Sequence, residues 1–232
     1  MIEAEKQGRG VVITGGLGVL GAAVAGVFRT RGDRVMLIDF AMQAEEGLSA
    51  DEVIVNADLA DPTHAQYAMA RAAAQLGAID VLINTAGSYA WEIAGPGTFV
   101  TLQRLWLANM ATCFNACIAA LPHMSDGGRI VNVGAAAADR GSAGHSSYAA
   151  AKSGVARLTE ALAEEAAERS IAVNAVLPAI MDTPANRVAM PDADPNRWTA
   201  PAAIAEVIGF LASRQARAIN GALVPVTAPA HD

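Results

Sequence analysis

The chain has 232 residues, a hydrophobic fraction of 53%, 21 glycines and a formal net charge of −7. This length and apolar content fit one α/β domain spanning residues 1–232 and exclude a disordered chain. The acidic balance offers no basic stripe to nucleic acid or to an anionic membrane. The first residues have no apolar core behind a positive flank, so we expect no secretory signal and a cytoplasmic protein.

Short runs rich in Val and Ile alternate with alanine-rich segments of helical length. The predicted strands are 11–14, 34–39, 52–56, 79–84, 129–133, 171–177 and 222–226. The predicted helices are 20–31, 62–75, 99–121, 146–169 and 201–213. Parallel strands that are buried on both faces lack polar alternation, so this rhythm predicts a Rossmann-like, doubly wound parallel sheet of about seven strands flanked by helices.

Two connections break the rhythm. Residues 39–52 are too few for a full crossover helix, so we expect a short or irregular link there. Residues 179–196 carry three prolines and little periodicity, which predicts a mobile flap.

Cys113 and Cys117, one helical turn apart, are expected in the core, and the four histidines show no metal-ligand spacing with them. We therefore expect no metal site.

A glycine-rich loop follows the first strand and opens the first helix. Gly16, Gly18 and Gly21 satisfy the dinucleotide fingerprint, since glycines let the backbone approach a pyrophosphate and the helix start presents free amides to it. The residues of this segment that we expect at the cofactor are Gly15, Leu17, Gly18, Val19, Leu20 and Gly21.

Asp39 ends the second strand, 18 positions after Gly21. A carboxylate there can accept hydrogen bonds from the adenosine ribose, and its charge would repel a 2′-phosphate. The sequence therefore predicts NAD(H) over NADP(H). The alternative is an aspartate that only caps the strand end.

Tyr148 and Lys152 are four residues apart on a predicted helix, so they share one face. A lysine charge beside the phenol would favour the phenolate and let Tyr148 exchange a proton during a redox reaction. The alternative is that Tyr148 is an amphipathic core residue and Lys152 a solvated neighbour.

Together these motifs make the chain resemble the short-chain dehydrogenases/reductases. The resemblance implies that Asp58 and Leu59 border the adenine. It places Asn84, Ala86 and Gly87 along the adenosine, and Pro178, Ile180 and Thr183 at the nicotinamide. Lys152 would also bind the nicotinamide ribose, and Asn109 would help to hold a water of the proton relay.

One position departs from the family pattern. A serine usually stands 13 residues before the tyrosine, where this chain has Ala135, and loss of such a donor costs about 10² to 10³ in rate. Ser142, Ser146 and Ser147 do not occupy its place. The segment from Ala175 to Trp198 is similar to that of dihydropteridine reductases, which also lack the serine and prefer NADH.

The sequence therefore predicts an NAD(H)-dependent reductase of a small carbonyl or conjugated C=N substrate, with Tyr148, Lys152 and Asn109 in catalysis. Tyr89, Trp91 and Trp198 are candidates to stack on a flat substrate. One alternative is a quinonoid dihydropteridine reductase, and another is an NAD(H)-binding sensor or scaffold with little catalysis. The resemblance also implies a homodimer or homotetramer through the helices 99–121 and 146–169.

Overall fold

The computed structural model describes residues 8–44 and 52–227 of the chain. Seven parallel strands form one sheet in the order β3-β2-β1-β4-β5-β6-β7, which confirms the predicted fold class. The strands are β1 (Gly10–Thr14), β2 (Arg34–Ile38), β3 (Val53–Ile54), β4 (Ile79–Asn84), β5 (Met124–Val133), β6 (Ala172–Pro178) and β7 (Leu223–Val226). The order reverses between β1 and β4, and ligands of open α/β sheets bind outside the carboxyl ends of the strands at such a switch point.

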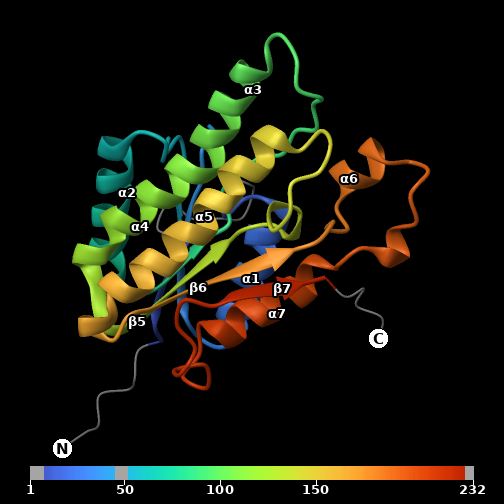
Figure 1. The fold of residues 1–232 in the computed structure, drawn as a ribbon. Coiled ribbons are helices and arrows are strands. Elements are labelled where there is room, and N and C mark those ends of the chain that lie inside the picture. The colour runs from blue at the N-terminus through green and yellow to red at the C-terminus, as the bar shows by residue number, and fades with distance from the viewer. Residues whose placement is uncertain (1–7, 45–51, 228–232) are drawn as a thin grey trace, which may run out of the picture.

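Helices cover both faces of the sheet (Figure 1). They are α1 (Val19–Thr30), α2 (Pro62–Leu76), α3 (Thr98–Leu105), α4 (Thr112–Ala120), α5 (Ser146–Glu165), α6 (Pro184–Ala189) and α7 (Pro201–Leu211). Side chains alternate along each strand, so paired Val12 and Leu82 enter the core under α2, α4 and α5. Their neighbours Ile13 and Ile83 enter the core under α1 and α7.

Two predicted elements differ in detail from the structure. The expected continuous helix over residues 99–121 contains a π-helical turn, Trp106–Ala111, between α3 and α4. The segment 179–196 contains α6 and a 3-10 helix, Pro195–Arg197, which its weak periodicity did not predict. Of the predicted irregular link, residues 40–44 contain no helix, and residues 45–51 lie outside the described part of the chain.

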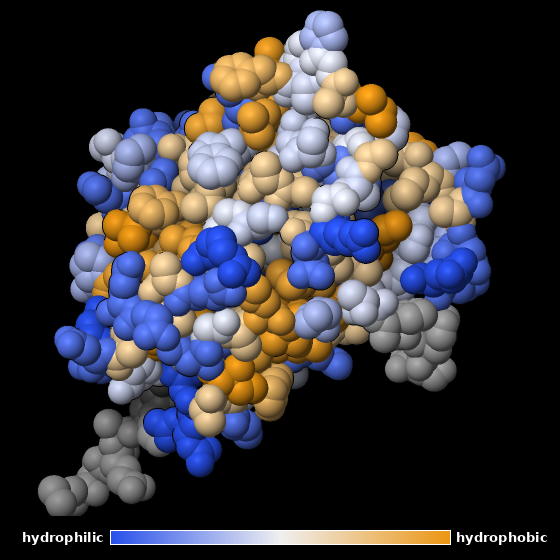
Figure 2. Space-filling model, in the orientation of Figure 1, coloured by the Kyte–Doolittle hydropathy of each residue, from blue (hydrophilic) through white to orange (hydrophobic). Residues whose placement is uncertain are grey.

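The helical segment Thr98–His123 is long and apolar enough to cross a membrane by length and composition alone. Its inner side packs in the core, where Cys113, Ala116 and Cys117 are buried, and the core helix of a soluble protein passes the same test. Phe114 and Ile118 are exposed on its outer side. Figure 2 shows apolar side chains on this face interspersed with hydrophilic ones. The prediction that both cysteines lie in the core is confirmed.

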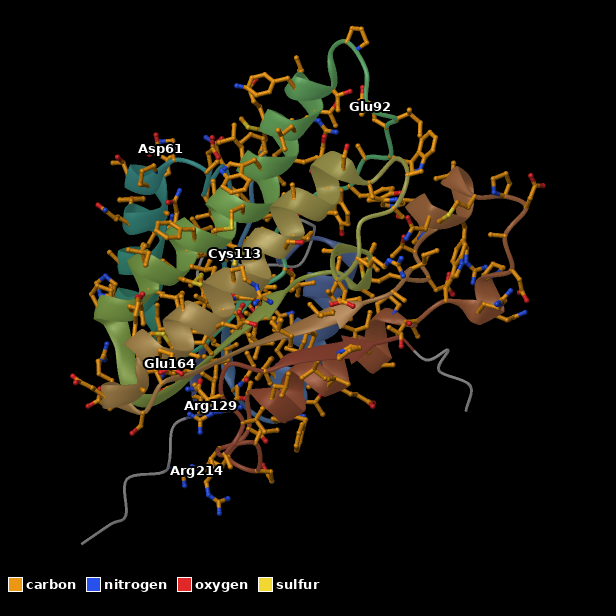
Figure 3. The ribbon with its side chains drawn as sticks, in the orientation of Figure 1. Asp61, Glu92, Cys113, Arg129, Glu164 and Arg214 are labelled. Carbon is orange, nitrogen blue, oxygen red and sulfur yellow. The ribbon has the colours of Figure 1, made fainter. Side chains whose placement is uncertain are left out.

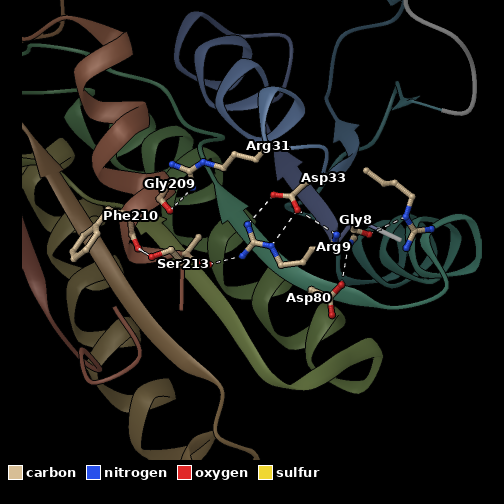
Figure 4. A network of polar contacts seen from close by, with 11 residues as sticks. Gly8, Arg9, Arg31, Asp33, Asp80, Gly209, Phe210 and Ser213 are labelled. Carbon is tan, nitrogen blue, oxygen red and sulfur yellow. Dashed lines mark hydrogen bonds and ion pairs between the residues drawn. The ribbon is translucent and has the colours of Figure 1, made fainter. Parts of the chain in front are cut away.

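Arginine side chains tie the elements together at the amino ends of the strands (Figure 4). Arg9, just before β1, makes two hydrogen bonds to the Asp33 carboxylate, at 2.7 and 3.2 Å, and donates a third to the carbonyl oxygen of Ala212 at 2.7 Å. Arg31 donates to the carbonyl oxygen of Gly209 in α7 at 2.7 Å. These bonds fix α1 and α7 at this end, while the opposite end of the sheet carries the loops of the site.

Candidate active site

All seven strands run in the same direction, so the sheet has an amino end and a carboxyl end, and side chains at both ends are labelled in Figure 3. Arg129 and Arg214 lie near the amino ends of the strands, and Glu92 lies in a loop beyond their carboxyl ends. Most of the residues that the sequence predicts for cofactor and catalysis belong to loops and helix starts at the second end. The site can therefore be built there from the glycine loop outward.

The glycine loop between β1 and α1 approaches the chain after β4 very closely. Gly15 has φ +64°, and a Cβ at this position would lie 2.7 Å from the backbone nitrogen of Ala86. Both the left-handed conformation and the contact require glycine. Gly18 is the N-cap of α1 and makes no side-chain cap hydrogen bond. The first amides of α1 are therefore available to an anionic ligand.

A cavity of about 680 Å³ opens beside this loop at the switch point between β1 and β4. Eight of the residues predicted to bind the cofactor line it, namely Gly15, Leu17, Gly18, Asp39, Asp58, Leu59, Ala86 and Gly87. Its wall also includes Ile38, Phe40, Ala41, Ala57, Ala60, Thr85, Arg104, Leu107, Ala108 and Thr112. The glycine loop and the ends of β2, β3 and β4 thus share one concave surface.

Asp39 holds a fixed position on this surface. Its carboxylate accepts hydrogen bonds from the backbone amides of Leu17 and Ala41, both at 3.0 Å. These bonds connect the end of β2 to the glycine loop. A carboxylate oriented in this way leaves oxygen lone pairs for further donors, because each carboxylate oxygen can accept two hydrogen bonds.

The other residues predicted for the cofactor do not line this cavity. Val19 and Ile180 are exposed, while Leu20 and Pro178 are buried and Gly21 packs on the carbonyl oxygen of Gly15. Thr183 caps α6, because its hydroxyl accepts a hydrogen bond from the amide of Asn186. The ends of β6 and α6 are thus placed beyond the cavity that the glycine loop defines.

Asn84 is also away from the cavity wall, inside a buried polar network. Its amide nitrogen donates to Asn132 Oδ1 at 2.9 Å and to Cys117 Sγ at 3.2 Å, and its oxygen accepts from the Thr14 hydroxyl at 3.2 Å. The network links β1, β4, β5 and α4. Asn84 therefore supports the strand ends from within, rather than forming the surface along the adenosine that the resemblance implied.

Asn109 clamps the loop after β4. It is 1% exposed and lies in the π-helical turn Trp106–Ala111. Its Oδ1 accepts from the Ser88 amide at 3.2 Å, and its Nδ2 donates to the carbonyl oxygens of Ser88 and Leu105, both at 2.9 Å. A π turn inside an α-helix frequently marks a functional site. Here it places the asparagine side chain against the backbone of the loop.

Lys152 is buried under the same loop. Its Nζ donates to the carbonyl oxygen of Val133 at 2.8 Å, and burial lowers the pKa of Lys152 to about 8. A Cβ placed on Gly87 would lie 3.3 Å from this Nζ and 2.6 Å from Asn109 Oδ1. The predicted residues Gly87, Asn109 and Lys152 therefore meet at one edge of the cavity.

Tyr148 lies one helical turn before Lys152 on α5, with its ring largely buried. Burial and then the neighbouring Tyr89 phenol raise the pKa of Tyr148 to about 12. The expected lowering of the Tyr148 pKa is therefore not found in the chain by itself, because loss of water around the phenolate dominates the shift. Burial also disfavours the charge of Lys152.

The place of the usual serine is apolar. Ala135 is 5% exposed and directly precedes a 3-10 helix, Ala136–Ala138. The nearby serines are not free substitutes: the Ser142 hydroxyl contacts His145 Nδ1 at 3.0 Å, and Ser147 is buried. Ser146 is exposed at the start of α5. The loop after β5 thus places no serine hydroxyl at the position that Ala135 occupies.

The three predicted aromatic residues have different surroundings. Tyr89 and Trp91 are more than half exposed. The Tyr89 ring meets the Tyr148 ring edge-on, with centroids 5.0 Å apart, and Trp91 packs against Gly144. Trp198 is only 7% exposed, so it packs in the interior and leaves little of its ring for the predicted stacking on a substrate. Tyr89 and Trp91 thus lie at exposed positions near the start of α5, the helix that carries Tyr148.

Several residues of the site escaped prediction from sequence. Arg104 and Ala108, on α3 and the π turn, line the cavity, and Asn115 of α4 donates to the carbonyl oxygens of Leu59 and Ala60 at 3.0 Å. His145 contacts the Tyr89 hydroxyl at 3.2 Å. The helical period of residues 99–121 could have placed Arg104, Ala108 and Asn115 on one face, since they are spaced by four and seven.

Comparisons with known proteins bear on this arrangement. The pattern of the short chain dehydrogenase family matches residues 9–194. The chain belongs to this family. The 2-(R)-hydroxypropyl-CoM dehydrogenase of Xanthobacter autotrophicus is 33% identical over 237 residues, covering 92% of this chain and 95% of that protein. The cis-4-hydroxycyclohexanecarboxylate dehydrogenase of Sinomonas cyclohexanicum is 34% identical over 241 residues, covering 94% of each.

A solved relative of similar architecture contains a cofactor. It is a blue fluorescent protein from a metagenomic library in complex with NADPH, with a TM-score of 0.82 and 29% identity, covering 97% of this chain and 99% of that one. Membership of the short chain dehydrogenases makes this chain an oxidoreductase that uses a nicotinamide cofactor. A second solved relative, a short chain dehydrogenase from Burkholderia cenocepacia, is in complex with NADP, and neither of the two dehydrogenases above is a pterin reductase.

Proposed function

We propose that the chain transfers hydride between NAD(H) and a small carbonyl compound or the corresponding secondary alcohol, with Tyr148 as the proton donor or acceptor. The observation that carries this proposal is the meeting of Gly87, Asn109 and Lys152 at the edge of the cavity, one helical turn from Tyr148. A polar cluster next to a dinucleotide-sized cavity is what proton-coupled hydride transfer requires.

The residues present fit a nicotinamide dinucleotide. Gly15 leaves room where a Cβ would meet Ala86, the start of α1 carries uncapped amides, and the cavity of about 680 Å³ adjoins both. Asp58 and Leu59 form the wall beside the end of β3. When bound, the cofactor supplies or accepts the hydride.

The preference for NAD(H) rests on Asp39. Its carboxylate lies on the cavity wall and is oriented by the amides of Leu17 and Ala41. It can accept hydrogen bonds from two ribose hydroxyls, whereas a 2′-phosphate would face its negative charge. Arg104 also lines the cavity, so the choice of cofactor depends on which of the two charges lies closer to the ribose.

The protonation state of Tyr148 favours carbonyl reduction. With a pKa of about 12, the phenol keeps its proton at neutral pH and can donate it to the developing alkoxide. Lys152, one helical turn after Tyr148 on α5 and held by the Val133 carbonyl oxygen, can carry a charge that offsets the tyrosinate that results. Asn109 fixes the backbone of Ser88, so the loop that faces the reacting carbonyl keeps its shape.

A conjugated C=N compound such as a quinonoid dihydropterin is the second candidate substrate. Ala135 favours it, because proton delivery to nitrogen depends less on a hydroxyl that stabilises an alkoxide. Tyr89 and Trp91 offer exposed rings to a planar substrate in either case.

Tyr148→Phe tests the proposal. We expect turnover of NADH with a panel of ketones, quinones and quinonoid dihydropterin to fall by about 10³ or more, while the Kd for NADH stays within about twofold. The matched control is Tyr67→Phe, which alters an exposed phenol on α2. Unchanged turnover in Tyr148→Phe would overturn the mechanism, and NADH binding by a wild-type chain without any turnover would favour a sensor.

A further inference from the structure

We propose that Tyr89 is a second catalytic residue, whose hydroxyl donates to the substrate oxygen in place of the missing serine, and that His145 is its positioning residue. This inference rests on the proposed function, since it assigns the donor that carbonyl reduction requires at this site. Tyr89 transfers no atom: the reduced carbon receives hydride, the oxygen receives the Tyr148 proton, and Tyr89 keeps its own.

The first argument is position. The Tyr89 ring meets the Tyr148 ring edge-on at 5.0 Å, with an angle of 83° between the planes. The preceding residue, Ser88, is held at both its amide and its carbonyl oxygen by Asn109. The backbone before Tyr89 is therefore fixed, and its phenol is held next to the group that delivers the proton.

The second argument is the hydrogen bond at the Tyr89 hydroxyl. His145, three residues before Tyr148, places Nε2 at 3.2 Å from this oxygen. Its Nδ1 lies 3.0 Å from the Ser142 hydroxyl and 3.2 Å from the carbonyl oxygen of Ala143. With hydrogen on Nε2, the Ser142 hydroxyl donates to Nδ1, and Nε2 donates to the Tyr89 oxygen, which leaves the Tyr89 O–H free for the substrate. With hydrogen on Nδ1, that nitrogen donates to the Ala143 carbonyl oxygen, and the Tyr89 O–H donates to Nε2 until a substrate oxygen replaces it as the acceptor.

The third argument is exposure. Tyr89 is 54% exposed although its ring contacts both Tyr148 and His145. The loop that carries it is fastened to the turn before α5, because the Glu92 amide donates to the Gly144 carbonyl oxygen at 2.9 Å and Trp91 packs on Gly144. A fixed phenol with an open side is suited to meet a ligand.

One rival donor stands beside it. The Ser88 hydroxyl is buried and has no hydrogen-bond partner among the described residues. The Ser88 hydroxyl is closed off from solvent, whereas the Tyr89 side chain is exposed where a substrate can reach it. We therefore assign the role of donor to Tyr89. The rival can be separated from Tyr89 by substitution.

Tyr89→Phe should lower kcat for a ketone substrate by about 10- to 100-fold with a smaller change in KM, because the lost interaction belongs to the transition state. In the Tyr89→Phe background, Ala135→Ser should recover about tenfold or more of that loss. His145→Ala should lower kcat in the wild-type background but have little further effect in Tyr89→Phe, since His145 acts through Tyr89. The Kd for NADH should stay constant throughout.

Tyr67→Phe is the control for loss of a phenol, and Ser88→Ala tests the rival. Full kcat in Tyr89→Phe, a loss in Ser88→Ala instead, or additive effects of His145→Ala and Tyr89→Phe would each overturn the inference. If Tyr148→Phe abolishes turnover and Tyr89→Phe does not change it, the inference fails alone. If neither variant changes turnover, the proposed function fails with it.

Discussion

The site has two halves, a glycine-loop half whose surface is mostly backbone and a side-chain half around Tyr148. Around the glycine loop, the surface is made of backbone amides, glycines and one carboxylate held by amides, as at Gly15, Gly18 and Asp39. Around Tyr148, it is made of side chains that come from separate loops, namely Tyr89, Ala135 and His145. A backbone surface tolerates few alternatives, whereas the side-chain half can change its chemistry by single substitutions.

Lys152 joins the two halves, and its burial can be measured apart from any substrate. With a folded pKa of about 8, against about 10.4 for a free lysine, the unfolded chain binds more protons between these values. Stability of the wild-type chain should therefore rise with pH across that window. Lys152→Met removes the titrating group. The free energy of unfolding of this variant, taken relative to that of wild type, should therefore be about 2 kcal/mol lower at pH 10 than at pH 7.

Urea unfolding of both chains at pH 7 and pH 10 provides the measurement. Loss of the hydrogen bond to Val133 shifts the difference equally at both pH values, so only its change with pH is diagnostic. Tyr67→Phe serves as a surface reference. A difference that does not change with pH would mean that Lys152 is not desolvated, and the lysine would then belong to the solvated alternative.

The glycine-loop half could be predicted from sequence because its motif lies within a few consecutive residues. The fingerprint at Gly16, Gly18 and Gly21 follows a strand and precedes a helix, and the structure places that loop beside the cavity. Asp39 was located in the same way, from its place at a strand end. Local order and spacing are enough when the backbone itself forms the surface.

The side-chain half could not be predicted to the same depth because it depends on contacts between distant residues. Tyr89 and His145 are 56 positions apart, and no spacing rule connects them. The pKa of Tyr148 follows from burial, which the four-residue spacing from Lys152 does not contain. Trp198 looked like a substrate contact by residue type alone, yet it is buried.

Asp39→Asn tests whether the glycine-loop half also sets the preference for NAD(H) over NADP(H). The variant keeps the shape of the side chain but loses the charge that opposes a 2′-phosphate, so the ratio of the Kd for NADPH to that for NADH should fall by about tenfold. Titration of the fluorescence of each reduced cofactor measures the two constants without a substrate. Asp58→Asn, on the same cavity wall, should leave the ratio nearly unchanged. Equal ratios in the wild-type chain and Asp39→Asn would remove Asp39 from this role.

The smallest expected effect reports on the side-chain half directly. The Tyr89 phenol contributes to the raised pKa of Tyr148, because two phenolates at this distance repel each other. Tyr89→Phe should therefore lower the Tyr148 titration midpoint, by about a few tenths of a pH unit, while burial keeps it above that of a free tyrosine. The chain has only three tyrosines, so ring-labelled nuclear magnetic resonance with one phenylalanine variant for each assigns every signal. A midpoint that stays fixed would show that the two hydroxyls do not sense each other, and Tyr89 would then be too far from the reacting oxygen to help Tyr148.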